Sequence, residues 1–246
     1  MKQTITPILS GTLLLASFSS FAQNDTAIAA AKNEIHIKID PSGKAPIKKP
    51  YWGNSLDGMI FSTALIDKGG DKILGTLRFS MFFHIGATYN YNISKNIGIY
   101  TGLDVKNIGL IEKFDTDDRT DKKRVYTLGV PVGLRLGNMK TRDYFFLGGG
   151  LDVAFHYKEK SWSDTYSKTK SNDWFSKKTE ILMPYIFAGV AYRGTTFKIQ
   201  YYPTNFLNEN FEQKLVGGGT LKPFAGKNVN LLLFSIGRDM SFGRKK

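Results

Sequence analysis

The fold is decided by the stretch Val125-Tyr-Thr-Leu-Gly-Val-Pro-Val-Gly-Leu-Arg-Leu136. From Tyr126 onward, large apolar side chains occupy every second position, and Thr, Gly, Pro and Arg occupy the positions between them. Successive side chains of a β-strand point to opposite faces, whereas a helix would distribute these residues around its circumference. The stretch therefore predicts a strand with one apolar face and one small or polar face.

Seven further strand-like stretches lie between Ser55 and Phe242, and the connections between them are long and short in turn. Apolar residues occupy both parities in the expected sixth strand, so its facing stays open. The layout predicts an all-β protein, an eight-stranded antiparallel transmembrane up-and-down β-barrel over residues 55–243. The expected strands span residues 55–66, 76–93, 97–111, 125–136, 144–157, 180–193, 196–204 and 228–242.

The N-terminal residues have the pattern of a secretory signal. Lys2 is followed by a mostly apolar run over residues 5–18 and by Ser20-Phe-Ala22, a small-x-small cleavage site. The run is shorter than the roughly 20 residues of a spanning helix, which disfavours a transmembrane anchor. We expect a signal peptide over residues 1–22 and a largely irregular periplasmic leader over residues 23–54. The leader could add a short edge strand or dock a partner, and the sequence leaves both open.

The lengths of the connections predict an orientation. Outer-membrane barrels have short periplasmic turns and longer extracellular loops. The expected short connections at residues 94–96, 138–142 and 194–195 would therefore face the periplasm. Because the strand count is even, we expect a cell outer-membrane protein with both termini in the periplasm.

The composition favours an anionic lipid surface. The chain has 34 Lys and Arg against 21 Asp and Glu, a formal net charge of +13 at pH 7. Nucleic-acid binding is disfavoured, because many basic residues lie in expected loops and in residues 243–246 instead of alternating with aromatics on one face. We expect a monomeric barrel among outer-membrane lipids and lipopolysaccharide, with a periplasmic or surface protein partner left open. Zero Cys and three scattered His offer no ligand spacing, so we expect no metal and no cofactor.

Three motifs carry a family resemblance. The stretch over residues 126–135 is preceded by Tyr100-Thr-Gly-Leu-Asp-Val105 and followed by Phe146-Leu-Gly-Gly-Gly150. Together they resemble the outer-membrane β-barrel family abundant in Bacteroidota, the PorT-like group, over residues 55–242. The resemblance implies a barrel fold and, as for a few members, an accessory role in secretion or gliding. It implies no catalytic residue.

The expected interior carries many ionisable residues. Side chains fill an eight-stranded barrel, which argues against a wide pore. Buried charges must pair, so the main hypothesis is an interior network that holds the strands in register. The alternative is an outer-leaflet lipid-modifying or proteolytic enzyme, in which His156 and Asp152 act with a loop serine such as Ser161 or Ser163. The residues expected inside, with His84 about opposite Lys106, are Arg78, His84, Asp104, Lys106, Arg135, Asp152, His156, Lys198 and Asp239.

The long loops contain aromatic residues among lysines and serines. Aromatics beside cations suit contact with carbohydrate or protein. Alternatively, these side chains fold back over the barrel mouth or form an interfacial girdle. We expect a non-catalytic protein with a structural, binding or accessory role, either in surface contact or as an envelope scaffold. The surface-contact candidates are Trp162, Tyr166, Trp174 and Phe175.

Overall fold

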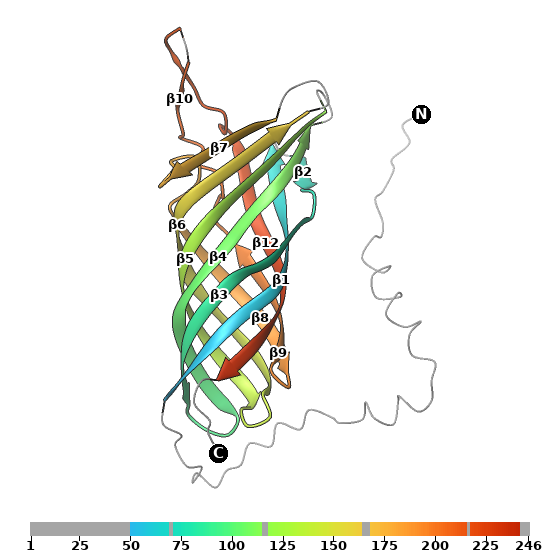
Figure 1. The fold of residues 1–246 in the computed structure, drawn as a ribbon, viewed down its shortest axis with the longest axis vertical. Helices are drawn as coiled ribbons and strands as arrows, with labels where there is room; N and C mark the ends of the chain where they lie inside the picture. The colour runs from blue at the N-terminus through green and yellow to red at the C-terminus, as the bar shows by residue number, and fades with distance from the viewer. Residues whose placement is uncertain (1–49, 69–70, 115–117, 164–167, 216, 242–246) are drawn as a thin grey trace, which may run out of the picture. The chain divides into compact units, whose positions relative to one another are not determined.

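The computed structural model describes residues 50–68, 71–114, 118–163, 168–215 and 217–241. Every regular element in these ranges is a β-strand (Figure 1). Within them, no helix has the length and apolar character needed to cross a bilayer. The expected signal peptide and most of the expected leader lie outside the described residues. The strands are β1 Tyr51–Lys68, β2 Asp71–Leu74, β3 Arg78–Asn92, β4 Ile97–Phe114, β5 Arg119–Asn138, β6 Asp143–Trp162, β7 Thr169–Trp174, β8 Leu182–Tyr192, β9 Thr195–Tyr202, β10 Gln213–Lys214, β11 Thr220–Leu221 and β12 Lys227–Ser241.

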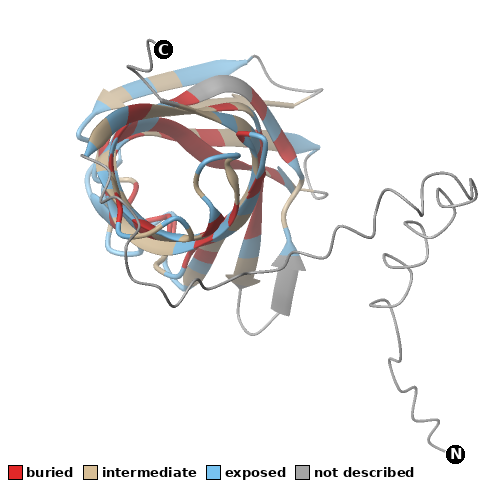
Figure 2. Cartoon of the chain, turned by 90° about the horizontal axis from the view of Figure 1, so that it is seen from below, coloured by how far each residue is buried: buried red, intermediate tan, exposed pale blue. Residues whose placement is uncertain are grey.

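Eight of these strands close into a ring. Hydrogen-bonded neighbours follow the order β12-β9-β8-β6-β5-β4-β3-β1, and β1 pairs back with β12. The pairings around the ring are antiparallel. Figure 2 shows the closed ring from one end. The predicted eight-stranded antiparallel barrel is confirmed.

The two ends of the barrel differ. Short connections at residues 93–96, 139–142 and 193–194 lie at one end, which we call the turn end. Polar side chains stabilise these turns. The Ser94 hydroxyl, for example, accepts hydrogen bonds from the backbone N–H groups of Asn96 and Ile97 at 3.1 and 3.0 Å. The opposite end, the loop end, carries the long connections, with β2, β7 and β10 (top of Figure 1).

The two faces of each strand differ as the alternation predicts. On β5, Leu128, Val130 and Val132 are exposed on the outer face, while Thr127 and Gly129 are buried. A continuous apolar outer surface of this kind suits hydrocarbon and not water. The same exposed apolar set recurs on the neighbouring strands as Ile85, Ile99, Leu103, Val105, Leu147, Leu151, Ile186, Val190, Phe197, Ile199 and Phe234.

The structure settles the facing of the sixth ring strand, β8. Its burial alternates strictly from Leu182 to Phe187, with Met183, Tyr185 and Phe187 buried inside and Ile186 exposed. Apolar residues occur at both parities because each face of β8 meets an apolar environment. The even positions face outward, and the odd positions fill the barrel interior.

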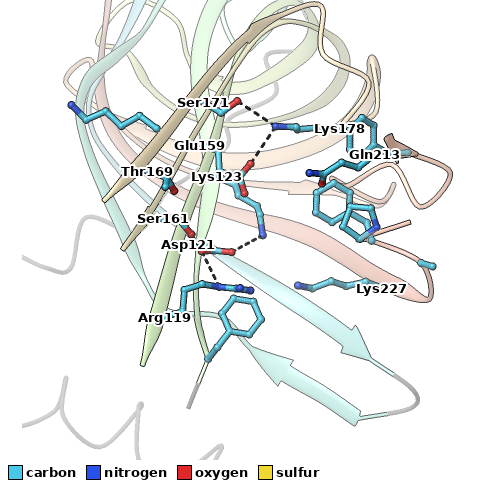
Figure 3. A pocket seen from close by; sticks show the side chains of 16 residues that line it. Arg119, Asp121, Lys123, Glu159, Ser161, Thr169, Ser171, Lys178, Gln213 and Lys227 are labelled. Atoms are coloured by element: carbon cyan, nitrogen blue, oxygen red, sulfur yellow. Dashed lines mark hydrogen bonds and ion pairs between the residues drawn. The ribbon is translucent and has the colours of Figure 1, made fainter. Parts of the chain in front are cut away.

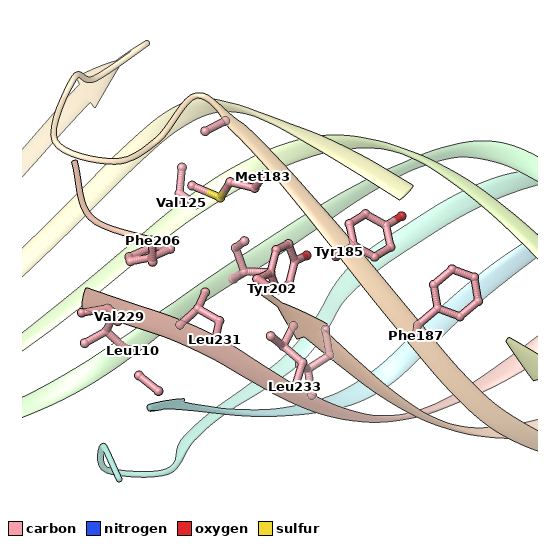
Figure 4. Close-up of a cluster of buried hydrophobic side chains, with 14 of the residues drawn as sticks. Leu110, Val125, Met183, Tyr185, Phe187, Tyr202, Phe206, Val229, Leu231 and Leu233 are labelled. Carbon is pink, nitrogen blue, oxygen red and sulfur yellow. The ribbon is translucent and has the colours of Figure 1, made fainter. Parts of the chain in front are cut away.

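A cluster of buried apolar residues lies inside the barrel, and the part of it around Phe206, Val229 and Leu231 lies toward the loop end (Figure 4). Phe206 and Leu207, which follow β9, are 2 % and 0 % exposed and belong to this cluster. Part of the last long connection therefore folds back into the barrel. The other members shown in Figure 4 include Leu110, Val125, Met183, Tyr202, Val229, Leu231 and Leu233.

Several strands are longer than the sequence predicts. β1 begins at Tyr51, so residues 51–54 belong to the barrel and not to the expected leader; the Trp52 ring packs 5.2 Å from that of Tyr89 on β3. β4, β5 and β6 continue into the charged segments expected to be loops, and β7 pairs with β6 there. These segments stay extended because their inward charges pair across strands, as Glu112 does with Lys123.

Candidate functional site

A cavity of about 460 Å³ opens at the loop end of the barrel (Figure 3). The extensions of β4, β5 and β6, the edge strand β7 and the connection before β12 form its walls. Three phenylalanine rings, several hydroxyls and a set of charged groups line it. The lining residues are Phe114, Arg119, Asp121, Lys123, Glu159, Ser161, Thr169, Lys170, Ser171, Lys178, Phe211, Gln213, Pro223, Phe224, Ala225 and Lys227.

Lys123 lies at the centre of the charged wall. Its ammonium is 2.5 Å from Oε2 of Glu112 and 3.6 Å from Oδ2 of Asp121. Lys227 pairs with the other oxygen of Glu112, and the Ser161 hydroxyl donates to Asp121. Because each of these groups has partners on other strands, the wall is held in place before a ligand enters.

Another part of the cavity combines the cation of Lys178 with aromatic rings. The Lys178 ammonium is 3.5 Å from Oε2 of Glu159 and 3.2 Å from Oδ2 of Asp173. The rings of Phe211 and Phe224 pack 5.9 Å apart. Flat apolar rings beside hydrogen-bonding groups provide two kinds of contact for a polar ligand.

A second group of charges lies inside the barrel. His84 bridges two strands, because Nδ1 pairs with Asp57 and Nε2 lies 3.2 Å from Oδ2 of Asp104. The ammonium of Lys198 is 2.7 Å from Asp57. His84 is directly opposite Lys106 in the β3–β4 register, as counting from the turn predicts. The predicted interior network is present at these residues.

Asp152 belongs to the same network. Its Oδ1 is 2.8 Å from the Lys106 ammonium, and its Oδ2 accepts hydrogen bonds from Tyr202 at 2.6 Å and Thr127 at 3.2 Å. Gly129 provides the space, since a Cβ at this position would come within 2.3 Å of Oδ1 of both Asp104 and Asp152. The carboxylate of Asp152 is therefore fully engaged in holding strands together.

His156 lies on the outer side of the barrel, and its expected inward facing is wrong. The β5–β6 register skips Phe155, so the facing of β6 reverses beyond this bulge. The His156 ring stacks on Trp174 at 4.4 Å and lies 5.6 Å from the ring of Tyr126. Counting positions without the bulge put this residue on the wrong face.

The structure does not bring the residues of the catalytic alternative together. Asp152 is buried in the interior network, and Ser161 bonds to Asp121 in the loop-end cavity. His156 points away from both. The other residues expected inside lie as follows: Arg135 is 3.5 Å from Asp239, and buried Arg78 donates to the Asn107 side chain at 2.7 Å.

The four aromatic surface candidates do not form one group. Trp174 and Phe175 are 68 % and 64 % exposed. Trp162 is half-buried, and its ring lies 5.3 Å from the Lys160 ammonium. Tyr166 lies outside the described residues. None of the three described candidates lines the cavity, whose aromatic side chains come from other segments.

Comparison with known proteins identifies the family. Residues 58–244 match the family model described as outer membrane protein beta-barrel domain. The chain belongs to this family. It is therefore an outer-membrane protein, as its apolar outer surface also requires. No curated protein matches the sequence.

Two solved structures are similar at low identity. Neisserial surface protein A has 12 % identity and a TM-score of 0.43, with 79 % of this chain and 100 % of that chain covered. The attachment invasion locus protein Ail of Yersinia pestis, in complex with the heparin analogue sucrose octasulfate, has 13 % identity and a TM-score of 0.39. That match covers 76 % of this chain and 99 % of that chain.

The lipid-facing band ends before the cavity begins. On β5 the exposed apolar residues run as far as Leu128 toward the loop end, and beyond Tyr126 the strand carries Arg124 and Lys122.

Glu112 on β4 also lies beyond the lipid-facing band, because it pairs in register with Asp121 on β5. Burial there opposes ionisation of Glu112, but the charges of Lys123 and Lys227 outweigh it and lower its pKa. Glu112 is thus held in its ionised form beside Lys123 and Lys227, two residues of the cavity wall.

Sequence reasoning missed the cavity because its walls come from segments expected to be loops. One signal was present in the alternation itself. Asp121 and Lys123 are two residues apart, as are Glu159 and Ser161, so each pair shares one face of a strand. Continuing the period-2 reading of β5 would have placed Asp121 and Lys123 on the inner side. On β6 the same reading would have placed Glu159 and Ser161 outside, because the bulge at Phe155 is what turns them inward.

Proposed function

We propose that this protein is a non-catalytic surface-binding protein of the outer membrane, which holds a glycan in the cavity at its loop end. In this proposal the loop end faces the outside of the cell and both termini lie in the periplasm. The barrel is monomeric, binds no nucleic acid and is surrounded by outer-membrane lipids and lipopolysaccharide. A PorT-like relationship and a periplasmic partner for residues 23–54 stay predictions.

The cavity carries this proposal. Phe114, Phe211 and Phe224 offer apolar ring surface, while Ser161 and Gln213 belong to a polar wall. Sugars present both apolar C–H faces and many hydroxyls, so they match this combination. A cavity of about 460 Å³ falls in the size range of small-ligand sites.

The charge of the walls favours acidic sugars. Five basic and two acidic side chains line the cavity. Glu112 and Asp173 do not line the cavity, but they pair with the lining residues Lys123 and Lys178. The net charge of the lining residues together with these two carboxylates is still positive. Carboxylate or sulfate groups on a glycan would complement it.

The interior argues against transport as the main activity. The ionic network of Asp57, His84 and Lys198 fills the middle of the barrel, and the apolar cluster around Phe206 fills the part toward the loop end. The cavity within the ionic network measures only about 30 Å³, roughly the share of one water molecule. Binding at the open end is the activity that this geometry supports.

Binding of purified protein to an array of acidic and neutral oligosaccharides tests the proposal. We expect selective binding of uronate-, sialate- or sulfate-bearing glycans. Phe211→Ala should weaken it about tenfold, because it removes ring surface from the cavity wall. Phe175→Ala is the matched control, since this ring is 64 % exposed and lies outside the cavity.

Three outcomes would count against this site. The array could show no binding at all, Phe211→Ala could leave the affinity unchanged, or Phe175→Ala alone could weaken it. The last result would move the binding surface to the segment around Phe175, which follows β7.

A further inference from the structure

The outer face of β5 and β6 carries cations directly opposite one another beyond the lipid-facing band. Lys122 on β5 pairs in register with Lys160 on β6. One row nearer the membrane, Arg124 pairs with Lys158. Lys123 and Glu159 line the cavity, so the residues on either side of them point outward.

This arrangement is unfavourable for the protein alone. Like charges directly opposite each other destabilise a sheet. The acidic residues of β5, β6 and β7 at this end are Asp121, Glu159 and Asp173, and all three make ion pairs with cavity-side lysines or arginines. In the described part of these strands, no carboxylate is interleaved with the outward cations near the loop end.

The neighbouring positive charges lower the pKa values of two of these lysines. Contact with Lys168 and the charge of Lys168 lower the pKa of Lys160 most, and loss of water contact and the charges of Lys170 and Lys122 lower it further. Burial, followed by the charges of Arg78 and Arg124, lowers the pKa of Lys122. An anion bound on this face would lessen the like-charge repulsion that contributes to both shifts.

The position of these cations relative to the membrane indicates which kind of anion would bind them. Between the cations and the apolar band lies a row of rings, Tyr126, His156 and Trp174, in cross-strand register. Aromatic rings of this kind mark the boundary between hydrocarbon and headgroups. The Lys158 ammonium is 5.3 Å from the Tyr126 ring, so the cations begin where the headgroups of the surrounding leaflet lie.

We propose that Lys122, Arg124, Lys158 and Lys160 form a binding site for the phosphate groups of the outer-leaflet glycolipid. Neighbouring strands lie about 4.8 Å apart, so one phosphate can accept hydrogen bonds from cations of both β5 and β6. This inference rests on the proposed outward orientation of the loop end, but not on any ligand in the cavity.

Native mass spectrometry of the detergent-solubilised full chain tests the site, with bisphosphorylated lipid A as the probe. We expect the variant with all four residues changed, Lys122→Gln, Arg124→Gln, Lys158→Gln and Lys160→Gln, to bind at least about tenfold more weakly than the wild type. The matched control loses the same charge elsewhere, through Lys140→Gln, Lys177→Gln, Lys214→Gln and Lys222→Gln, and should bind as the wild type does.

The source of the phosphate and the fold are checked in the same experiment. Dephosphorylated lipid A should bind as weakly to the wild type as bisphosphorylated lipid A binds to the fourfold variant, and millimolar inorganic phosphate should not compete. Equal binding by both fourfold variants, phosphate-independent binding, or competition by inorganic phosphate would overturn the proposal. Heat-dependent migration on gels shows that each variant is a folded barrel, and glycan-array binding by the fourfold variant separates failure of this site from failure of the cavity.

Discussion

Lys106→Met is expected to destabilise the barrel by about 3–5 kcal/mol, because it removes one partner from a buried ionic network. The Lys106 side chain is 1 % exposed, and its ammonium lies 2.8 Å from Asp152 and 3.4 Å from Asp104. Methionine keeps much of the side-chain volume but leaves two buried carboxylates without their shared cation. Urea-induced unfolding in detergent micelles, followed by tryptophan fluorescence, measures the difference.

Two further variants make this result interpretable. Lys113→Met changes an exposed lysine on the same strand, so its effect should stay within about 0.5 kcal/mol. Adding Asp152→Asn to Lys106→Met should recover part of the lost stability, because one of the uncompensated charges disappears. If Lys106→Met unfolds at the same urea concentration as the wild type, the interior network does not stabilise the barrel.

Val132→Arg should destabilise the protein by about 2–4 kcal/mol in phospholipid vesicles, the range found for a cation at the middle of a lipid-facing strand. Val132 lies within the apolar outer face of β5 and is 60 % exposed in the structure. If water covered this face, an exposed Val→Arg change would alter stability by only about 0.5 kcal/mol. The size of the loss therefore reports which solvent touches the strand.

Thr120→Arg is the control for this substitution. It places the same side chain on the outer face of the same strand, in register with Trp162 and beyond the lipid-facing band. Its cost should stay within about 1 kcal/mol, since the penalty for a cation falls toward the membrane surface. Equal costs at residues 120 and 132 in a vesicle unfolding titration would contradict a lipid-facing band that ends near Tyr126.

The barrel could be predicted from the sequence because one physical constraint acts on every strand. A strand with lipid on one side and a filled interior on the other must alternate, and Tyr126 to Leu136 does so without interruption. The short turn after β3 also set the register, which is why His84 was correctly placed opposite Lys106. Local pattern and tertiary structure agree on strands such as β5, whose inward residues are small or polar, whereas on β8 both faces are apolar and the pattern left the facing open.

Prediction failed where this constraint ends. Beyond the lipid-facing band both faces of a strand meet polar surroundings, so β5 and β6 lose their apolar alternation although they continue as strands. The bulge at Phe155 inserts one residue without a distinctive local sequence, and it moved His156 to the other face. The cavity assembles from segments as distant in sequence as Asp121 and Phe224, which no local pattern connects.

Both proposed binding sites require the loop end to face the outside of the cell, and cysteine labelling measures this directly. The chain contains no cysteine, so a single introduced thiol reports its own position. Gly217 lies in the long connection before β12 with no atom close to its Cβ position, and exposed Lys140 lies in the β5–β6 turn.

A membrane-impermeant maleimide should label Gly217→Cys in intact cells and Lys140→Cys only after the outer membrane is permeabilised. The reverse pattern, or labelling of Gly217→Cys only after permeabilisation, would contradict the orientation on which both sites depend.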